Sequence, residues 1–414
     1  MKFGGTSLGD VERLRWAARH VKRECDAGHE VAVVVSAAGG ETDRLAELAR
    51  TAAPLHDARE YDAIVASGEQ VNAAMMAIVL QSIGIQARSW QGWQIPITTS
   101  DAHGAARIMD IDTAPLEERL AQGQVAVICG FQGIGPDRRV TTLGRGGSDT
   151  SAVAVAAALG AACCDIYTDV DGVYTTDPRI VPAARRLERI SYEEMLEMAS
   201  LGARVLQTRS VELAMTHGVR LRVRSTFDEP EARPSDIPAT DSGIGTLVCD
   251  EEEIVEQEIV SGIAYARDEA KVTLLRVADK PGVAAGVFGP LAASGINVDM
   301  IVQNVSDDGQ HTDLTFTVPK SDLERALATI EAARDRIGYE RLTGQADIVK
   351  VSVIGIGMRS HAGVAAQMFQ TLADRGINIQ AITTSEIKVS VLIDAAYAEL
   401  AVRALHAAYG LDAE

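Results

Sequence analysis

The chain is poor in the residues that mark secreted and membrane proteins. It has only five cysteines in 414 residues, an odd number without paired spacing, which favours free thiols in a reducing cytoplasm over a disulfide framework. The longest weakly polar run, residues 151–164, is too short and too rich in alanine to span a bilayer. No basic segment followed by an apolar stretch opens the chain, so we expect no signal peptide and no membrane partner.

The chain also has fewer basic than acidic residues. Lysine and arginine number 39 against 58 aspartates and glutamates, and the net charge is −19. Part of the excess is local, because residues 228–258 hold eleven acidic side chains and one basic side chain, Arg233. This balance argues against nucleic acid or an anionic membrane as a partner. It leaves an anionic small substrate open, since nearby lysines, arginines and helix ends set the field inside a pocket.

The length of the chain predicts two or three domains. In residues 1–227, short β-branched runs alternate with helical patterns, which predicts an α/β domain with a mainly parallel sheet. The expected strands include 31–36, 125–130 and 165–169, and the expected helices include 11–27, 69–83 and 148–159. Residues 228–258 then combine three prolines with acidic and small polar residues, so we expect an exposed linker or a long loop there.

The remaining residues, 259–414, contain an internal repeat. Gly282-Val283-Ala284-Ala285 recurs as Gly363-Val364-Ala365-Ala366, and further pairs share the same offset of 81 residues. A fixed offset means two copies of one small unit. Each copy has the order strand, helix, strand, strand, helix, which is typical of a ferredoxin-like βαββαβ unit.

The second copy lacks a fourth strand at its C-terminal end. A strand-like segment, 259–265, precedes the first copy and has no other assignment. Pairing it with the second copy would complete that sheet and cover an exposed edge. We therefore expect the first unit, about 271–345, to be inserted in a second unit made of 259–265 and 347–414.

Two glycine-rich motifs suit an anionic ligand. Lys2-Phe3-Gly4-Gly5-Thr6-Ser7 sets paired glycines beside a lysine, so that backbone N–H groups and an ammonium can approach phosphate oxygens. Residues 142–149 place Arg145 among three glycines and lead into a helix, whose start favours an anion. The planar guanidinium of Arg145 suits a carboxylate. Taken alone, the first motif could be a tight turn and the second a structural loop.

Two further segments are candidates for binding polar groups. Glu69 stands at the start of a helix, where it either favours the helix N-terminus or holds a substrate ammonium group. Residues 165–179 form a strand and a polar loop, at the carboxyl edge where α/β sheets bind ligands. That loop could also be plain turn chemistry.

Taken together and in order, these segments resemble the amino-acid kinase family, and within it the aspartokinases with a tandem ACT tail. The resemblance covers nearly the whole chain, and its combination of motifs is specific although no single motif is. It rests on the segments above together with Ser36–Asp43, Ser67–Val71, Ser191–Glu212, Asp279–Gly282 and Ser385-Glu386. It implies a three-layer α/β sandwich with a mainly parallel sheet in 1–227, followed by two ferredoxin-like ACT domains in 259–414.

The resemblance also implies a role for individual residues. The catalytic set would be Lys2, Arg145 and Asp149. L-aspartate would be held by Thr42, Glu69, Arg145, Gly146, Gly147 and Ser148. ATP, which carries most of the Mg²⁺ coordination itself, would contact Lys2, Phe3, Gly4, Gly5, Ser7, Ser36, Thr168, Asp169, Tyr174, Asp177 and Arg179. Effector amino acids, lysine or threonine or both, would bind at Asp279, Gly282, Asn297, Val298, Asp299, Gln303, Ala365, Ala366, Asn378, Ile379, Ser385 and Glu386. A homo-oligomer formed through the ACT domains is expected, and no metal site made by protein side chains alone.

The implied reaction is phosphorylation of the aspartate side chain, the first step towards lysine, threonine and methionine. A carboxylate with a pKa near 4 is already ionised at pH 7, so the reaction needs no general base. The protein has to bring two anions together and stabilise the transferring phosphoryl group. Another amino-acid kinase, acting on glutamate, N-acetylglutamate or a nucleotide, is the first alternative. A non-catalytic amino-acid sensor is the second, and the tail could be purely structural or dimerising.

One departure from the family concerns the start of the chain. Aspartokinases have several apolar residues before the Lys-Phe-Gly-Gly motif, and here Met1 alone precedes Lys2. A phosphate loop in a parallel sheet normally follows a buried strand. We therefore expect the natural start to lie upstream of Met1.

Overall fold

The computed structural model describes residues 1–95, 97–201, 205–230, 244–254, 259–305, 309–361 and 363–412. The chain divides into two compact units. The first unit comprises Met1–Val173, Arg186–Ala199 and Arg204–Val255, and the second comprises Tyr174–Arg185, Ser200–Ala203 and Glu256–Glu414. Two short segments from the middle of the chain therefore belong to the C-terminal unit.

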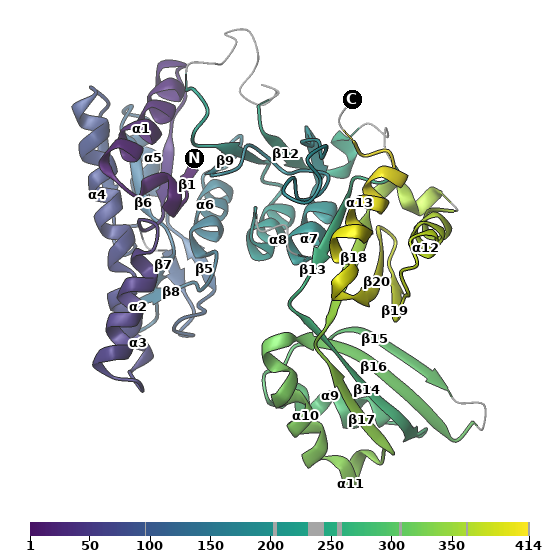
Figure 1. The fold of residues 1–414 in the computed structure, drawn as a ribbon. Helices are drawn as coiled ribbons and strands as arrows, with labels where there is room; N and C mark the ends of the chain where they lie inside the picture. The colour runs from purple at the N-terminus through teal and green to yellow at the C-terminus, as the bar shows by residue number, and fades with distance from the viewer. Residues whose placement is uncertain are drawn as a thin grey trace. The chain divides into compact units, whose positions relative to one another are not determined.

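The first unit is built on an eight-stranded sheet in the order β10-β12-β11-β9-β1-β2-β6-β3 (Figure 1). Neighbouring strands are parallel except for the pair β11 and β12. The strands are β1 (Lys2–Phe3), β2 (Ala32–Val35), β3 (Ala87–Trp90), β6 (Val125–Cys129), β9 (Cys164–Thr168), β10 (Arg189–Ser191), β11 (Leu221–Ser225) and β12 (Thr246–Cys249). The predicted mainly parallel sheet is confirmed, and the strands predicted at 31–36, 125–130 and 165–169 are present to within a residue or two.

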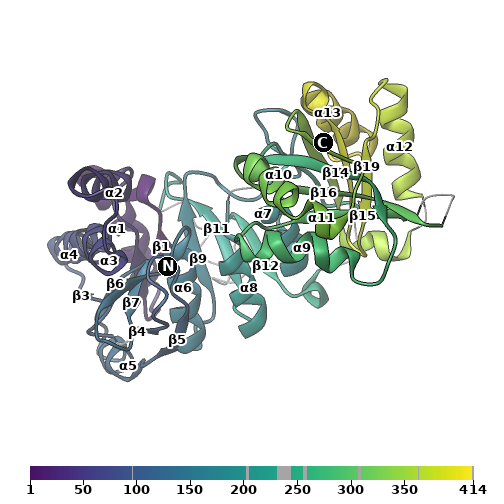
Figure 2. The same cartoon turned by 90° about the horizontal axis from the view of Figure 1, so that it is seen from below.

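Helices cover both faces of this sheet, as a three-layer sandwich requires. Helices α1 and α4 lie together on one face, and α6 lies on the other with α8 packed against it (Figures 1 and 2). The helices of the first unit are α1 (Val11–Asp26), α2 (Glu41–Ala52), α3 (Ala58–Val65), α4 (Ser67–Ser82), α5 (Ala114–Leu120), α6 (Gly147–Ala158), α7 (Tyr192–Ser200) and α8 (Thr208–His217). The core between α1, α4 and the sheet contains Phe3, Val33, Val35, Met76 and Leu80.

A smaller sheet, in the order β5-β4-β7-β8, extends the first unit. Its strands are β4 (Ile97–Thr99), β5 (Ile108–Ile111), β7 (Gln132–Ile134) and β8 (Val140–Thr142). The strand β7 follows β6 after only two residues, and β8 leads into the glycine-rich segment before α6. This sheet therefore joins two of the loops at the carboxyl edge of the large sheet.

Helices α3 and α4 form an apolar stretch that the sequence analysis did not single out. Residues Ala58–Ser82 are long and apolar enough to cross a membrane by length and composition. In the fold, 56% of the most apolar window is buried, and α4 packs on the large sheet. We therefore assign the stretch to the protein core.

The structure corrects one predicted boundary. The segment 228–258 was expected to be a linker, but its residues 246–249 form β12 between β10 and β11. Leu247, Val248 and Cys249 are buried, so this apolar stretch completes the sheet despite its acidic neighbours. Residues 231–243 and 255–258 of the expected linker lie outside the described residues.

The second unit holds two four-stranded antiparallel sheets, one for each sequence repeat. The first has the order β15-β16-β14-β17 and the second the order β13-β18-β20-β19. The first repeat contains β14 (Glu269–Ala278), α9 (Val283–Ala293), β15 (Asp299–Val305), β16 (His311–Pro319), α10 (Leu323–Ala332), α11 (Arg334–Ile337) and β17 (Arg341–Gln345). The second contains β13 (Gly262–Ala266), β18 (Ile348–Ile354), α12 (Val364–Asp374), β19 (Ala381–Thr384), β20 (Lys388–Asp394) and α13 (Ala398–Ala408).

The expected pairing of a strand from before the first repeat with the second repeat is present in this unit. Strand β13 pairs antiparallel with β18 over Gly262–Ala266 and Lys350–Ile354. It takes the place of the fourth strand that the second repeat lacks, so the first repeat is inserted between β13 and β18. Both sheets thus reach the same ferredoxin-like order, one of them with a strand from earlier in the chain.

The segment Tyr174–Arg185 joins this unit through Thr175. The hydroxyl of Thr175 lies 2.8 Å from Nε2 of His406 in α13, and its carbonyl accepts a hydrogen bond from Ile263 N of β13 at 2.7 Å. His406 is fully buried, and burial lowers its pKa, opposed by a contact with Asp412 at 3.0 Å. The neutral imidazole can therefore bridge the Thr175 hydroxyl and the side-chain carboxylate of Asp412.

Candidate functional site

The candidate site lies at the carboxyl edge of the large sheet. Strands β9, β1, β2 and β6 are parallel neighbours, so the residues that follow them meet at one edge. Gly4 and Gly5 follow β1, Ser36 follows β2, Gly130 follows β6, and Asp169 follows β9. Two of the four predicted motifs, those after β1 and β9, thus contribute residues to one place.

The two glycines after β1 pack tightly against the turn after β2. Gly39 N donates a hydrogen bond to Gly5 O at 3.0 Å, and a Cβ on Gly5 would lie 2.8 Å from Ala37 O. Gly4 N donates to Tyr167 O at 3.1 Å, so this N–H is already engaged. Only glycine fits at position 5, because any side chain there would clash with the turn after β2.

Two residues predicted for the nucleotide site have interior side chains. The Phe3 ring is fully buried and stacks on Tyr167 with centroids 4.7 Å apart. The Ser7 hydroxyl lies 2.5 Å from the hydroxyl of Thr226 and is also buried. A phosphate group at this loop would therefore meet the backbone at these positions, with the side chains holding the loop from behind.

Lys2 and Asp149 form a buried ion pair at the same edge. Lys2 Nζ lies 2.5 Å from Asp149 Oδ1, and the two side chains are 10% and 11% exposed. Among the described residues this oxygen accepts no hydrogen bond, so its contact with Lys2 is a close pairing of charges. Asp149 lies in the first turn of α6, where the helix N-terminus also favours negative charge. The ammonium is thereby held beside Gly4, with Nζ 3.6 Å from the position that a Cβ on Gly4 would take.

The glycine-rich loop before α6 leaves the Arg145 side chain open. Gly144 and Gly146 adopt left-handed backbone angles, with φ of 79° and 73°, which suits glycine. Arg145 between them is exposed and makes no hydrogen bond or ion pair with any residue in the described part of the chain. Ser148 is buried next to Gly130, where a Cβ would lie 2.9 Å from its Oγ. The loop thus presents one unpaired guanidinium beside a helix start.

Gly146 can be tested by adding one methyl group. A Cβ at this position would lie 2.0 Å from Gln207 Cγ, and the left-handed φ adds strain. We expect Gly146→Ala to lower both the melting temperature and the affinity for a carboxylate ligand. Gly84→Ala is the matched control, because it has φ of 85° and open space around the Cβ. It should cost only the backbone strain, about 1 kcal/mol. Equal melting temperatures for both variants would contradict the tight packing at Gly146.

Glu69 in α4 is a buried carboxylate with one free oxygen. It is 3% exposed, and Oε1 accepts a hydrogen bond from Ala37 N at 3.0 Å. Oε2 is buried and has no hydrogen-bond partner within the described residues. Burial raises the pKa of this carboxyl to about 7. An unpaired buried oxygen is costly, so it marks a place where a ligand ammonium group would be favourable.

The surroundings of Glu69 contain one residue that sequence reasoning missed. Asn72, one helical turn further along α4, donates from Nδ2 to Ser36 O at 2.8 Å and so holds the turn after β2. Its spacing of three from Glu69 within an apolar helix was the available signal. Thr42, predicted to bind substrate, lies half-buried in the first turn of α2.

The structure divides the residues predicted from the 165–179 segment. Thr168 and Asp169 belong to the first unit, where the Thr168 hydroxyl donates to Asp169 at 3.2 Å. Tyr174, Asp177 and Arg179 belong to the second unit. There Arg179 pairs with Asp177 at 2.7 Å, which lowers the pKa of that carboxyl.

The residues predicted for effector binding lie at equivalent places in the two repeats. Gly282 and Gly363 precede α9 and α12 with left-handed φ of 91° and 111°. The side chain of Asp299 is engaged, because it accepts from Lys350 Nζ of the second repeat at 2.6 Å. The others lie around the helix starts and the strands that follow: Asp279, Asn297, Val298, Gln303, Ala365, Ala366, Asn378, Ile379, Ser385 and Glu386.

Comparison with protein families assigns both parts of the chain. Residues 1–225 match the amino acid kinase family, and residues 271–335 and 351–409 each match an ACT domain. The aspartate kinase of Pseudomonas putida is 53% identical over 413 residues, which cover 100% of this chain and 97% of that protein.

Two solved structures of E. coli aspartokinase III are similar along nearly the whole chain. One is a complex with aspartate and ADP, in the R-state, with 27% identity, a TM-score of 0.77 and 98% coverage of each chain. The other is a complex with lysine and aspartate, in the T-state, with 27% identity, a TM-score of 0.73, and coverage of 99% of this chain and 98% of that one. The chain therefore belongs to the amino acid kinase family and, within it, to the aspartate kinases that carry two ACT domains.

Proposed function

We propose that the protein transfers the γ-phosphoryl group of ATP to the side-chain carboxylate of L-aspartate, giving 4-phospho-L-aspartate and ADP. The observation that carries this proposal is the combination of the Arg145 guanidinium and the buried Glu69 carboxylate. Among the described residues, Arg145 makes no hydrogen bond or ion pair, and Glu69 Oε2 has no hydrogen-bond partner. An acidic amino acid offers a carboxylate to Arg145 and its ammonium group to Glu69, and it keeps a second carboxylate to accept the phosphoryl group. The product is the first intermediate towards lysine, threonine and methionine.

For this reaction the protein has to position the two substrates and stabilise the negative charge on the transferring phosphoryl group. An oxygen of the aspartate side chain forms a bond to the γ-phosphorus while the bond to the bridging oxygen of ADP breaks, so no proton has to be removed. Lys2 and the N-terminus of α6 offset the negative charge on the transferring group. Asp149 holds the Lys2 ammonium at the loop before ATP arrives.

The donors at this edge fit a magnesium ion that enters on the nucleotide. Asp149 is a carboxylate in the first turn of α6, next to the bare backbone of Gly4 and Gly5. Mg²⁺ usually binds through one or two carboxylates and the substrate phosphates, with water completing its shell. Bound there, it would neutralise phosphate charge, and this chain would contribute at most Asp149.

The substrate can be identified by trapping the product. The protein is mixed with ATP, Mg²⁺ and one candidate acid, and hydroxylamine converts any acyl phosphate to a hydroxamate. We expect product with aspartate and none with glutamate or N-acetylglutamate. Product with another acid would reassign the substrate, and nucleotide binding without product from any acid would favour a sensor.

The ionisation of Glu69 predicts a pH dependence of aspartate use. Its pKa is raised to about 7 by burial in the ligand-free protein, so the carboxyl becomes neutral below that pH and no longer attracts an ammonium group. The value of kcat/KM for aspartate should therefore fall by about tenfold for each pH unit below 7. In Glu69→Gln, kcat/KM for aspartate should be low at every pH, and its plot against pH should show no inflection near 7. A Gln variant that kept the inflection would show that another group titrates.

We further propose that the second unit binds an end-product amino acid, lysine or threonine, and thereby inhibits the reaction. The support is the lysine complex of E. coli aspartokinase III and the position of β13, which ties the chain after the first unit into an ACT sheet. A ligand that prefers one arrangement shifts the equilibrium towards it. Activity with lysine, threonine, methionine and each pair tests this, and no inhibition at millimolar levels would contradict it.

Two further proposals concern the compartment and the oligomeric state of the protein. We place the protein in the cytoplasm, where its five cysteines remain free thiols, and expect it to form a homo-oligomer through the ACT domains. Its mass in solution, measured by light scattering with and without lysine, tests the assembly. A monomer at all concentrations would contradict it.

A further inference from the structure

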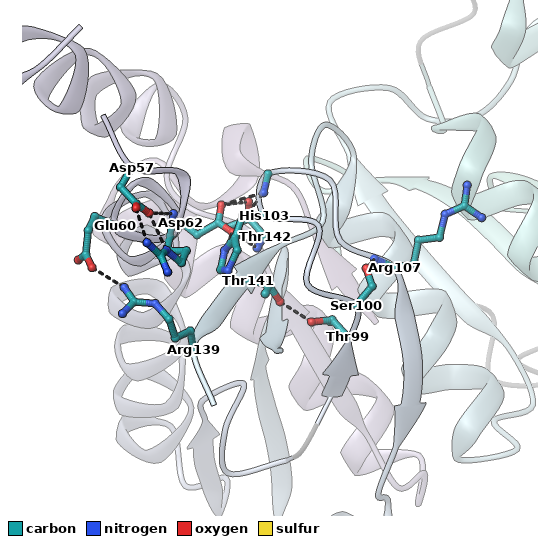
Figure 3. Close-up of polar contacts among 12 residues, drawn as sticks. Asp57, Glu60, Asp62, Thr99, Ser100, His103, Arg107, Arg139, Thr141 and Thr142 are labelled. Carbon is teal, nitrogen blue, oxygen red and sulfur yellow. Dashed lines mark hydrogen bonds and ion pairs between the residues drawn. The ribbon is translucent and has the colours of Figure 1, made fainter. Parts of the chain in front are cut away.

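Asp62 in α3 is a buried carboxylate that belongs to none of the predicted motifs. It is fully buried, and donors from two other segments converge on it (Figure 3). Thr142 donates from N at 3.0 Å and from Oγ1 at 2.6 Å, Gly104 N donates at 3.1 Å, and His103 Nδ1 lies 2.7 Å away. A charge inside a protein is costly unless it is fully hydrogen-bonded, so this convergence stabilises one arrangement of three segments.

Two of the three segments that meet at Asp62 continue into the candidate site. Helix α3 ends at Val65 and continues through Ala66 into α4, which carries Glu69. Thr142 ends β8 and leads into the loop that carries Arg145. One buried carboxylate therefore links the helix of the unpaired carboxylate to the loop of the unpaired guanidinium.

The turn that contains His103 supports the same loop from the other side. Ala106 N donates to Thr142 O at 2.9 Å, and a Cβ on Gly144 would lie 2.9 Å from Gly104 O. Arg209 bridges the two segments, with Nη1 on Leu143 O and Nη2 on Ala106 O, both at 2.9 Å. Loss of the Asp62 contacts would therefore loosen the loop and its support together.

We propose that Asp62 is a positioning residue that fixes Arg145 relative to Glu69, and so sets the affinity for the amino-acid substrate. This inference rests on the proposed function of the site. The nucleotide loop after β1 makes no hydrogen bond with this network among the described residues. A change at Asp62 should therefore affect the use of aspartate and leave the use of ATP as it was.

Asp62→Asn is the direct test, because it keeps the shape and turns an acceptor into an amide donor that faces other donors. We expect KM for aspartate to rise by about tenfold to a hundredfold with KM for ATP unchanged, as a small displacement of a binding group would cause. Thr142→Val removes one donor to Asp62 and should act in the same direction. Thr142→Ser keeps that donor and should restore the wild-type KM, which also covers the case in which Asp62→Asn does not fold.

Thr99→Val is the matched control for lost stability. The hydroxyls of Thr99 and Thr141 form a buried pair 2.5 Å apart, and Thr141 precedes Thr142 in the chain (Figure 3). Neither hydroxyl is among the described hydrogen-bond partners of Asp62. This variant should melt at a lower temperature with both KM values unchanged. The proposal is overturned if Thr142→Val raises both KM values equally, if it leaves KM for aspartate unchanged, or if Thr99→Val raises KM for aspartate as much.

The same assay separates this proposal from the function on which it rests. Wild-type protein that forms hydroxamate from aspartate, together with an unaffected Asp62→Asn, overturns the positioning role alone. Wild-type protein that forms no hydroxamate from aspartate overturns both.

Discussion

Lys2→Ala lowers the turnover of aspartate by about 10²–10³-fold, which is the usual effect of removing one preorganised charge contact at a reacting phosphoryl group. The structure places the Lys2 ammonium beside the bare glycine loop and pairs it with Asp149 at 2.5 Å. In the variant, the charge on the transferring group loses its cation, and Asp149 is left buried without a partner. Repulsion between Asp149 and the phosphates then adds to the loss.

The measurement is kcat under saturating ATP and aspartate, with a melting curve to confirm that the variant folds. Lys22→Ala is a suitable control, because Lys22 pairs with Asp26 on the exposed surface of α1 and its loss should leave kcat unchanged. A folded Lys2→Ala variant with near-normal kcat would remove Lys2 from the catalytic set.

Arg145→Ala weakens aspartate binding by roughly 30- to 1,000-fold and leaves ATP binding unchanged, as expected when one partner of a charged hydrogen-bonded pair is truncated. The side chain is exposed and unpaired among the described residues, so its removal should not disturb the fold. Arg145→Lys should recover only part of the affinity, because an ammonium cannot grip a carboxylate with two parallel hydrogen bonds.

Calorimetry with each substrate separately is the appropriate measurement. Arg119→Ala, in the last turn of α5, removes the same group from a helix away from the predicted motifs and serves as the control. Loss of ATP binding with aspartate binding retained would mean that the roles of Arg145 and the first glycine loop are exchanged.

The parts of the fold that could be predicted from sequence are those with a strong local pattern. The run Val33, Val34 and Val35 predicted a strand buried on both faces, and β2 (Ala32–Val35) contains this run. The repeat offset of 81 residues located both ferredoxin-like units, and the missing fourth strand pointed to residues 259–265. In each case the information lies in neighbouring residues or in a copy of the same pattern.

Other parts depend on contacts between distant residues and had no local pattern. Strand β12 is only four residues long and lies next to the acidic run Asp250–Glu253, so its burial depends on the place left between β10 and β11. Asp62 is one of two acidic residues in the short amphipathic helix α3, and its partner Thr142 is 80 residues away. The pairing of Thr175 with His406 joins positions 231 residues apart. None of these contacts has a signature within a short window of sequence.

The pairing of β13 with the second repeat imposes an order on the folding of the chain as it is synthesised. The first repeat is contiguous, so it can fold once residue 345 has emerged, whereas β13 has to wait for β18 and its sheet is complete only after β20. Until then β13 is a nascent strand with open edges. Folding of the inserted repeat brings its two ends together and reduces the loop-closure entropy of joining β13 to β18. The inserted domain thus acts as an internal folding aid for the domain that surrounds it.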